Sequence, residues 1–271
     1  MTRLVRRHPA VSFFVLAFVL SWAIWVPIAL DHLGVFASRV PGGFVTLGRL
    51  LGTLGPAVAA SIVARVADGR GGAKALWGLL GRWRVRWTWY AAALLVFPAL
   101  LVAAALVYRF LPGAGPLPTV EVSAASLVVT VIVLGISAVG EEVGWRGFAL
   151  PRLQRTMTAL GASLLLGAVW TSWHLPFWIA LGELEQFGPT YWLLSWLWIT
   201  AGSVYLTWLM NNTGNSLPMA LLFHGGYNLL SVGFLPLSGV VPAYRILVAL
   251  GWAVVIGVLA AFGPKTLRRS R

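Results

Sequence analysis

Two adjacent glutamates, Glu141 and Glu142, follow a long apolar run in the stretch AVGEEVGWRGFALPRLQ, although the whole chain holds only seven acidic residues. Neighbouring residues of an α-helix point about 100° apart, whereas residues four apart share a face. Arg146 therefore pairs readily with Glu142 alone, which leaves Glu141 as a carboxylate in apolar surroundings that is suited to general-base catalysis. The alternative is that both acids only neutralise nearby arginines at a helix end.

Two histidines and an asparagine lie in later apolar runs. His174 belongs to WTSWHLP, where Pro176 is expected to end or kink the helix just beyond it. Trp170 lies one turn earlier on the same face and is placed to wall a pocket around the imidazole. His224 and Asn228 lie four residues apart in HGGYN and share one helical face. Taken singly, each segment is also explained by helix packing with polar groups between the helices.

Together, a glutamate, two histidines and an asparagine in a membrane cavity fit the hydrolysis of an amide. Glu141 would deprotonate water, and His174 would hold this water or pass a proton to the leaving amine. His224 and Asn228 would donate hydrogen bonds to the developing oxyanion. Ionisable groups at membrane depth are costly unless paired or hydrated, which makes them functional candidates, and Arg49 belongs to the same group.

A metal-dependent version of this chemistry stays open. Glu141, His174 and His224 would supply three ligands of a catalytic zinc and leave a fourth position for water. The HExxH motif of zinc proteases is absent, and a chain without cysteine has no thiolate ligands or nucleophiles. Serine-based chemistry has no Gly-x-Ser-x-Gly motif to support it. The sequence leaves the cofactor undetermined, with a divalent metal such as zinc as one alternative.

The elements that must position these residues are membrane helices. Of the 271 residues, 59% are apolar and 10% are charged, the mean hydropathy is +0.85, and 15 residues are Trp. This composition indicates a polytopic membrane protein. We predict one all-α domain over residues 1–271, with eight transmembrane helices and the catalytic core helices at approximately 123–235. The predicted spans are 11–30, 44–66, 88–111, 123–145, 158–181, 190–210, 216–235 and 243–263.

The basic residues predict the orientation of the bundle. With a cytoplasmic N-terminus, 16 of the 20 Lys and Arg residues fall in cytoplasmic segments, and eight spans return the C-terminus to the same side. The other four are Arg39, Arg109 and Arg245 outside, and Arg49 within a span. Because the basic residues lie beside apolar runs, the net charge of +13 indicates orientation in a lipid bilayer and not nucleic-acid binding.

Three segments of the chain resemble the motifs of the CPBP family of intramembrane proteases, which comprises CAAX proteases and bacteriocin-processing enzymes and is also called the Abi family. EEVGWR at 141–146 matches EExxxR, WTSWH at 170–174 corresponds to FxxxH, and HGGYN at 224–228 matches HxxxN. In the second motif Trp170 replaces the usual Phe, an aromatic exchange expected to reshape the pocket without removing the chemistry. Motif order, chain length and the predicted spans all agree with the family.

The resemblance implies an eight-helix fold with a cavity open towards the cytoplasm. It implies that Glu141 is the water-activating base, assisted by His174, and that His224 and Asn228 stabilise the oxyanion. The predicted pair of Glu142 with Arg146 would support the site. The family carries a metalloprotease label, but the resemblance does not decide whether a metal is bound.

We therefore expect a multi-pass endopeptidase of the cell membrane that cleaves a peptide or membrane-protein substrate near the cytoplasmic face. The alternatives are a catalytically inactive scaffold or immunity protein of the same fold, and a proton-coupled transporter with Glu141 and the histidines as its relay. A transporter would favour two similar halves, and the chain shows no internal repeat. One geometric concern is depth, because simple end-to-end spans would separate Glu141 from His174 by roughly 10 Å at ~1.5 Å per residue.

Overall fold

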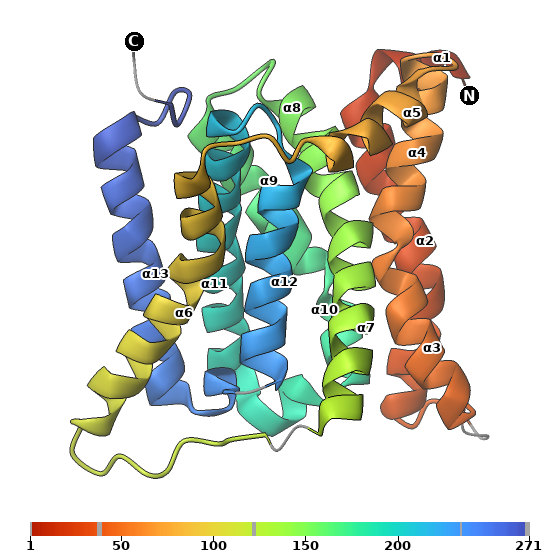
Figure 1. Cartoon of the computed structure of the whole chain (residues 1–271). Helices are drawn as coiled ribbons and strands as arrows, with labels where there is room; N and C mark the ends of the chain where they lie inside the picture. The colour runs from red at the N-terminus through yellow and green to blue at the C-terminus, as the bar shows by residue number, and fades with distance from the viewer. Residues whose placement is uncertain (1, 37–39, 121–122, 234, 269–271) are drawn as a thin grey trace.

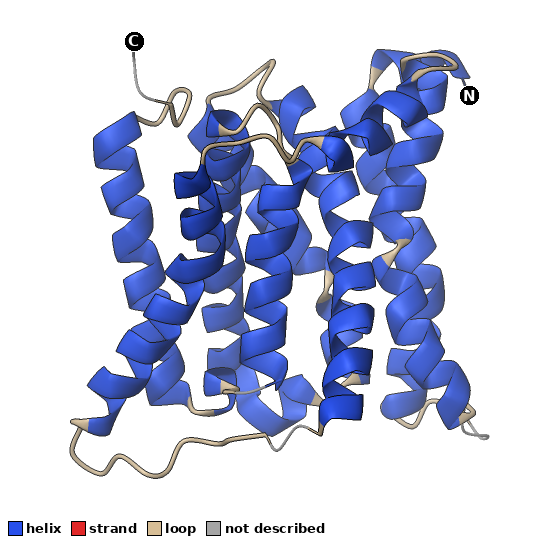
Figure 2. Cartoon of the chain, viewed as in Figure 1, coloured by secondary structure: helices blue, strands red, loops and turns tan. Residues whose placement is uncertain are grey.

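The computed structural model describes residues 2–36, 40–120, 123–233 and 235–268, and every regular element within these ranges is a helix (Figures 1 and 2). The long helices run side by side in one bundle. Five helices of the described chain are long and apolar enough to cross a membrane, or six if one bent pair counts as a single span. The predicted all-α, multi-pass fold is confirmed, while the count of eight spans stays a prediction.

The N-terminal half contains a bent pair of helices where the sequence predicts one straight span. Pro56 has no N–H for the helical hydrogen bond to Gly52, and the chain bends by 41° between α3 and α4. The Gly52 carbonyl instead accepts a hydrogen bond from the Ser21 hydroxyl at 2.7 Å. The helices of this half are α1 (Thr2–Arg7), α2 (Pro9–His32), α3 (Gly42–Thr53), α4 (Gly55–Ala67), α5 (Gly72–Trp77), η1 (Gly78–Gly81) and α6 (Trp87–Arg109).

The C-terminal half differs from the predicted spans at two places. The span predicted to end at residue 145 continues without a break to Leu153, as an α-helix, one π-helical segment and a last α-helical turn. The span predicted over 158–181 is interrupted at His174, because Pro176 cannot continue the helix. The helices are α7 (Ala124–Glu142), η2 (Val143–Ala149), α8 (Leu150–Leu153), α9 (Ala159–Trp173), α10 (Leu175–Ala180), α11 (Glu183–Asn212), α12 (Leu217–Gly233), η3 (Leu237–Gly239) and α13 (Val241–Phe262).

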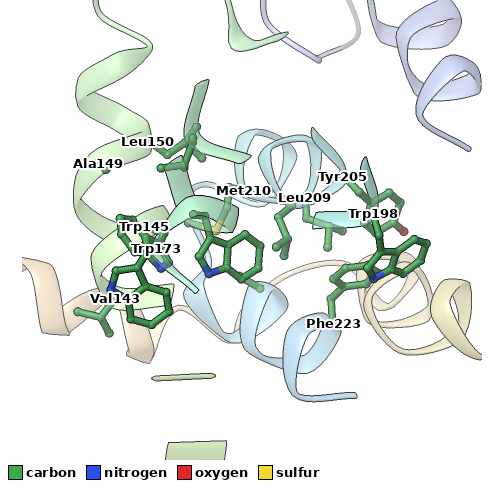
Figure 3. Close-up of a cluster of buried hydrophobic side chains, with 14 of the residues drawn as sticks. Val143, Trp145, Ala149, Leu150, Trp173, Trp198, Tyr205, Leu209, Met210 and Phe223 are labelled. Atoms are coloured by element: carbon green, nitrogen blue, oxygen red, sulfur yellow. The ribbon is translucent and has the colours of Figure 1, made fainter. Parts of the chain in front are cut away.

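Buried aromatic side chains hold these helices around the interrupted span (Figure 3). Trp173 packs against Trp25 of α2 and Trp145 of η2, with ring centroids 4.5 and 5.6 Å apart. All three indoles are completely buried. Aromatic pairs at such separations add to the free energy that their burial supplies. The break at His174 is therefore fixed in place by neighbours from α2 and η2.

Two ends of the bundle are distinguished by the elements that they carry. The described N- and C-terminal segments lie at one end, together with α1, α5 and α8, and we call it the terminal end (Figure 1). The opposite end, which we call the far end, carries the turn between α10 and α11, η3, and the beginnings of α3 and α7. Helices α7, α11 and α13 run from the far end to the terminal end, and α9 and α12 run the other way.

Candidate active site

The long helix formed by α7, η2 and α8 places Glu141 deep inside the bundle. Glu141 lies 12 residues before the last residue of this span at Leu153, and His174 lies 15 residues after the start of α9 at Ala159. Both residues are therefore at similar depths below the terminal end. The distance from His174 Nε2 to Glu141 Oε2 is 3.7 Å, so the predicted gap of roughly 10 Å is closed by the extension of the fourth span.

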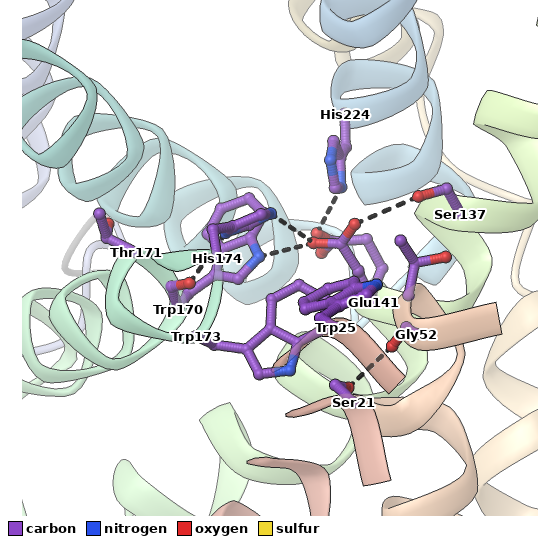
Figure 4. Close-up of polar contacts among 12 residues, drawn as sticks. Ser21, Trp25, Gly52, Ser137, Glu141, Trp170, Thr171, Trp173, His174 and His224 are labelled. Atoms are coloured by element: carbon purple, nitrogen blue, oxygen red, sulfur yellow. Dashed lines mark hydrogen bonds and ion pairs between the residues drawn. The ribbon is translucent and has the colours of Figure 1, made fainter. Parts of the chain in front are cut away.

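The Glu141 carboxylate is oriented by two hydrogen bonds (Figure 4). Its Oε2 accepts one from the indole N–H of Trp170 at 2.6 Å, and its Oε1 accepts one from the Ser137 hydroxyl at 3.3 Å. Only 3% of the Glu141 surface is exposed. A buried acceptor requires such donors, and the two bonds fix the direction in which the carboxylate points. The sequence placed Trp170 near the site but did not show that its N–H reaches Glu141.

The ring of His174 is fixed by a backbone hydrogen bond. Its Nδ1 lies 2.9 Å from the carbonyl oxygen of Trp170, which only accepts, so Nδ1 carries the proton. In the neutral ring, Nε2 is then an acceptor, and it faces Glu141. A separation of 3.7 Å is too long for a direct hydrogen bond, but a single water molecule reaches both atoms. Trp178 stacks on the same imidazole at a centroid distance of 5.3 Å.

Glu142 forms the predicted ion pair with Arg146, at 3.0 Å and with both side chains completely buried. The same oxygen, Oε1, lies 2.9 Å from Nδ1 of His224, a contact that the sequence did not predict. The Arg146 guanidinium lies 4.1 Å above the centre of the Trp170 ring. Glu142 thus contacts residues of both the first and the third motif, and Trp170 contacts both Arg146 and Glu141.

One cavity of about 410 Å³ connects the predicted site residues. Glu141, His174, His224 and Asn228 all line it, and Asn228 forms no hydrogen bond with another described residue. Glu142 and Arg146 lie behind this wall, outside the lining. The remaining polar lining includes Glu183 and the tyrosines at 191, 227 and 244.

Arg49, the other ionisable residue predicted within a span, does not join the site. Its Nη2 donates a hydrogen bond to the carbonyl oxygen of Ala180 at 2.9 Å. Ala180 is the last residue of α10, where helix carbonyls have no intrahelical partner and where a cation is favourable. Arg49 therefore stabilises a helix end.

Glu141, His174 and His224, which would bind zinc if a metal is present, stay a prediction. Within the described ranges, no group of three or more His, Asp and Glu side chains is arranged to hold a metal ion. Glu142 engages Nδ1 of His224 and leaves Nε2 free, and Oε2 of Glu141 accepts the Trp170 hydrogen bond. The cofactor stays undetermined, and the proposed mechanism assigns roles to side chains and water alone.

Comparison with known proteins identifies the same part of the chain. Residues 122–230 match the family model described as type II CAAX prenyl endopeptidase Rce1-like. CAAX prenyl protease 2 of Methanococcus maripaludis is 33% identical to the chain over 98 residues, which cover 35% of this chain and 36% of that protein. The chain thus spans about a third of the length of this curated relative. The resemblance to the CPBP family is confirmed, and the matched segment contains all six predicted site residues.

Proposed function

We propose that this protein is a membrane endopeptidase in which Glu141 activates water, because residues 122–230 match the Rce1-like family model. The observation that carries the proposal is the convergence of Glu141, His174, His224 and Asn228, from three separate segments, on one cavity. A peptide or a membrane protein would be the substrate. We further propose a single domain with eight spans in the cell membrane and both termini in the cytoplasm.

The reaction begins with a water molecule between Glu141 Oε2 and His174 Nε2, which are 3.7 Å apart. The neutral His174 ring accepts one hydrogen bond from this water and orients it. Glu141 takes the other proton as the water oxygen attacks the carbonyl carbon of the substrate. A tetrahedral intermediate forms, with its negative charge on the former carbonyl oxygen.

Collapse of the intermediate returns the proton. The protonated Glu141 donates it to the nitrogen of the leaving amine as the C–N bond breaks, so the carboxylate is regenerated. The catalytic cycle itself consumes no proton. Protons are exchanged with solvent only when the carboxylic acid and the amine that form become ionised. Glu141 therefore acts first as a base and then as an acid.

His224 and Asn228 would stabilise the oxyanion. The amide N–H₂ of Asn228 is a donor in any protonation state, whereas His224 already directs Nδ1 to Glu142. Donation from Nε2 of His224 therefore requires the doubly protonated ring, for which the Glu142 carboxylate supplies the opposite charge. Arg146 holds this carboxylate from its other side, and such preorganised groups are a main source of transition-state stabilisation.

The decisive experiment compares the wild type with Glu141→Gln on a peptide library, using purified protein and mass spectrometry. Loss of a general base is expected to lower kcat by at least about 100-fold. Glu185→Gln is the matched control, because Glu185 is exposed and lies outside the cavity lining. Thermal unfolding must show that each variant folds.

Three results would contradict the proposal in different ways. Cleavage that survives Glu141→Gln would exclude the assigned base. A rate lost on addition of a chelator and restored by zinc would require a metal in the mechanism. If no preparation cleaves any peptide, the scaffold or transporter alternatives would gain support.

A further inference from the structure

The cavity that contains Glu141 leads towards the far end of the bundle. Its lining passes from Glu141 and His224 to Leu181, Glu183 and Ser238, which lie at the α10–α11 turn and in η3. These elements are all at the far end in Figure 1. The last three residues are partly exposed, so the route ends at the molecular surface.

Buried side chains follow the glutamates on the side of the site that faces the terminal end. Trp145, Arg146 and Phe148 of η2 follow the glutamates towards the terminal end, and all three side chains are completely buried. Phe148 and Trp145 both contact Phe13 of α2, with centroid distances of 5.2 and 5.3 Å. The site is therefore closed on the terminal side and open on the far side.

The charges of the two ends differ strongly. Of the 17 Lys and Arg residues that the structure describes, 14 lie in segments at the terminal end, and among these 14 only Arg146 is fully buried. At the far end, Arg109 and Arg245 are accompanied by the acids Glu183 and Glu185. Loops rich in Lys and Arg stay in the cytoplasm, so this distribution orients the terminal end to the cytoplasm.

We propose that the cavity opens on the extracytoplasmic side of the membrane. The substrate would then be a peptide segment of a secreted or membrane-anchored protein that reaches the site from outside the cell. The inference about substrate rests on the proposed function, but the inference about the opening does not. Cytoplasmic termini and a cavity open to the cytoplasm, both expected from the sequence, are incompatible in this structure because they lie at opposite ends.

The chain lacks cysteine, so single cysteines can report this orientation without background. Ser238→Cys marks the mouth of the cavity and Ser231→Cys marks its interior, since both serines line it. Gly71→Cys is the matched control at the terminal end, where Gly71 is exposed and an added Cβ meets no atom within 4 Å. None of these positions belongs to the proposed catalytic machinery.

Intact cells expressing each variant would be treated with a charged, membrane-impermeant maleimide, before and after permeabilisation. We expect Ser238→Cys and Ser231→Cys to be labelled in intact cells, and Gly71→Cys to be labelled only after permeabilisation. Labelling of Gly71→Cys alone in intact cells would overturn the orientation. Labelling of Ser238→Cys without Ser231→Cys would overturn the route from the mouth to the site, and a thermal unfolding scan of each variant confirms its fold.

A second measurement connects the opening to the substrate. A charged peptide that the purified protein cleaves would be added to sealed right-side-out and inside-out vesicles. Cleavage at least about tenfold faster in right-side-out vesicles is expected, and the reverse ratio would overturn the proposal. If the purified protein cleaves no peptide, the proposed function fails, whereas the cysteine labelling still decides the orientation of the cavity.

Discussion

At the scale of single residues, Trp170 has the most specific contact in the site. Its indole N–H donates to the Glu141 carboxylate at 2.6 Å, and the phenylalanine usual at this position of the family motif has no such donor. The same ring supports the Arg146 guanidinium on its face. The aromatic exchange therefore adds a hydrogen bond to Glu141 and does more than reshape the pocket.

Trp170→Phe tests the value of this hydrogen bond. A hydrogen bond to a charged group contributes about 1.5–3 kcal/mol, so kcat/KM should fall on the order of 10- to 100-fold. Trp178→Phe is the matched control, because Trp178 lines the same cavity and Phe retains its stacking on His174. If steady-state kinetics show equal losses of kcat/KM in both variants, the size of the aromatic side chains in the cavity matters and the Trp170 hydrogen bond does not.

The buried ion pair leads to a prediction about stability. Arg146→Met leaves Glu142 buried without its guanidinium partner, which is expected to cost about 3–5 kcal/mol of unfolding free energy. The double variant Glu142→Gln/Arg146→Met should recover part of this loss, because no buried charge is left uncompensated. Arg155→Met, at an exposed arginine, should change stability by less than about 0.5 kcal/mol. Denaturant titration of the detergent-solubilised protein measures all three, and a small effect of Arg146→Met alone would contradict the assignment.

The sequence predicted part of the site because some contacts are local. Glu142 and Arg146 are four residues apart on one helix, so their pairing follows from helical geometry. The contact of His224 with Glu142 joins residues 82 positions apart, and the hydrogen bond from Trp170 to Glu141 spans 29. Such contacts depend on how the helices pack, which the local pattern of one sequence does not contain.

At the scale of elements, composition predicted the positions of the helices but not their continuity. Apolar runs identify helices because the membrane core contains no water. The backbone N–H and C=O groups of a spanning segment must therefore hydrogen-bond with one another, as they do in a helix. The extension of the fourth span to Leu153 includes Arg146 and Arg152, whose charges made the apolar run appear to end earlier. Burial of Arg146 in its ion pair allows the helix to continue, and that burial is a tertiary effect.

The packing of α7 against the bend between α3 and α4 can be tested at Gly140. A Cβ atom at this position would lie 2.6 Å from the carbonyl oxygen of Thr53, so Gly140→Ala must push the helices apart. We expect a loss of about 1–3 kcal/mol in stability and a lower rate of cleavage, since Glu141 is the next residue. Gly135→Ala on the same helix meets no atom within 4 Å and should be nearly neutral in both measurements. Equal thermal unfolding of the two variants would contradict this close approach.

At the scale of the whole molecule, the bundle has apolar side chains on its outside as well as inside. Large apolar residues such as Leu95, Val129 and Ile256 are each about 60% exposed on α6, α7 and α13. In water, so large an apolar surface would drive association, whereas in a bilayer it contacts lipid. The polar groups are instead collected in the central cavity, which is the arrangement that a hydrolytic site within a membrane requires.

Leu95→Lys tests whether this outer surface faces lipid. Leu95 is 62% exposed near the middle of α6, and a lysine close to the centre of a transmembrane helix costs about 2.5–3.5 kcal/mol of insertion free energy. The yield of folded protein in the membrane fraction should therefore fall severalfold. Leu4→Lys is the matched control, because Leu4 is 63% exposed but lies in α1 at the terminal end, where other basic residues are found. Similar yields for both variants would show that the middle of α6 does not contact the hydrocarbon core, and the eight-span arrangement would have to be revised around that helix.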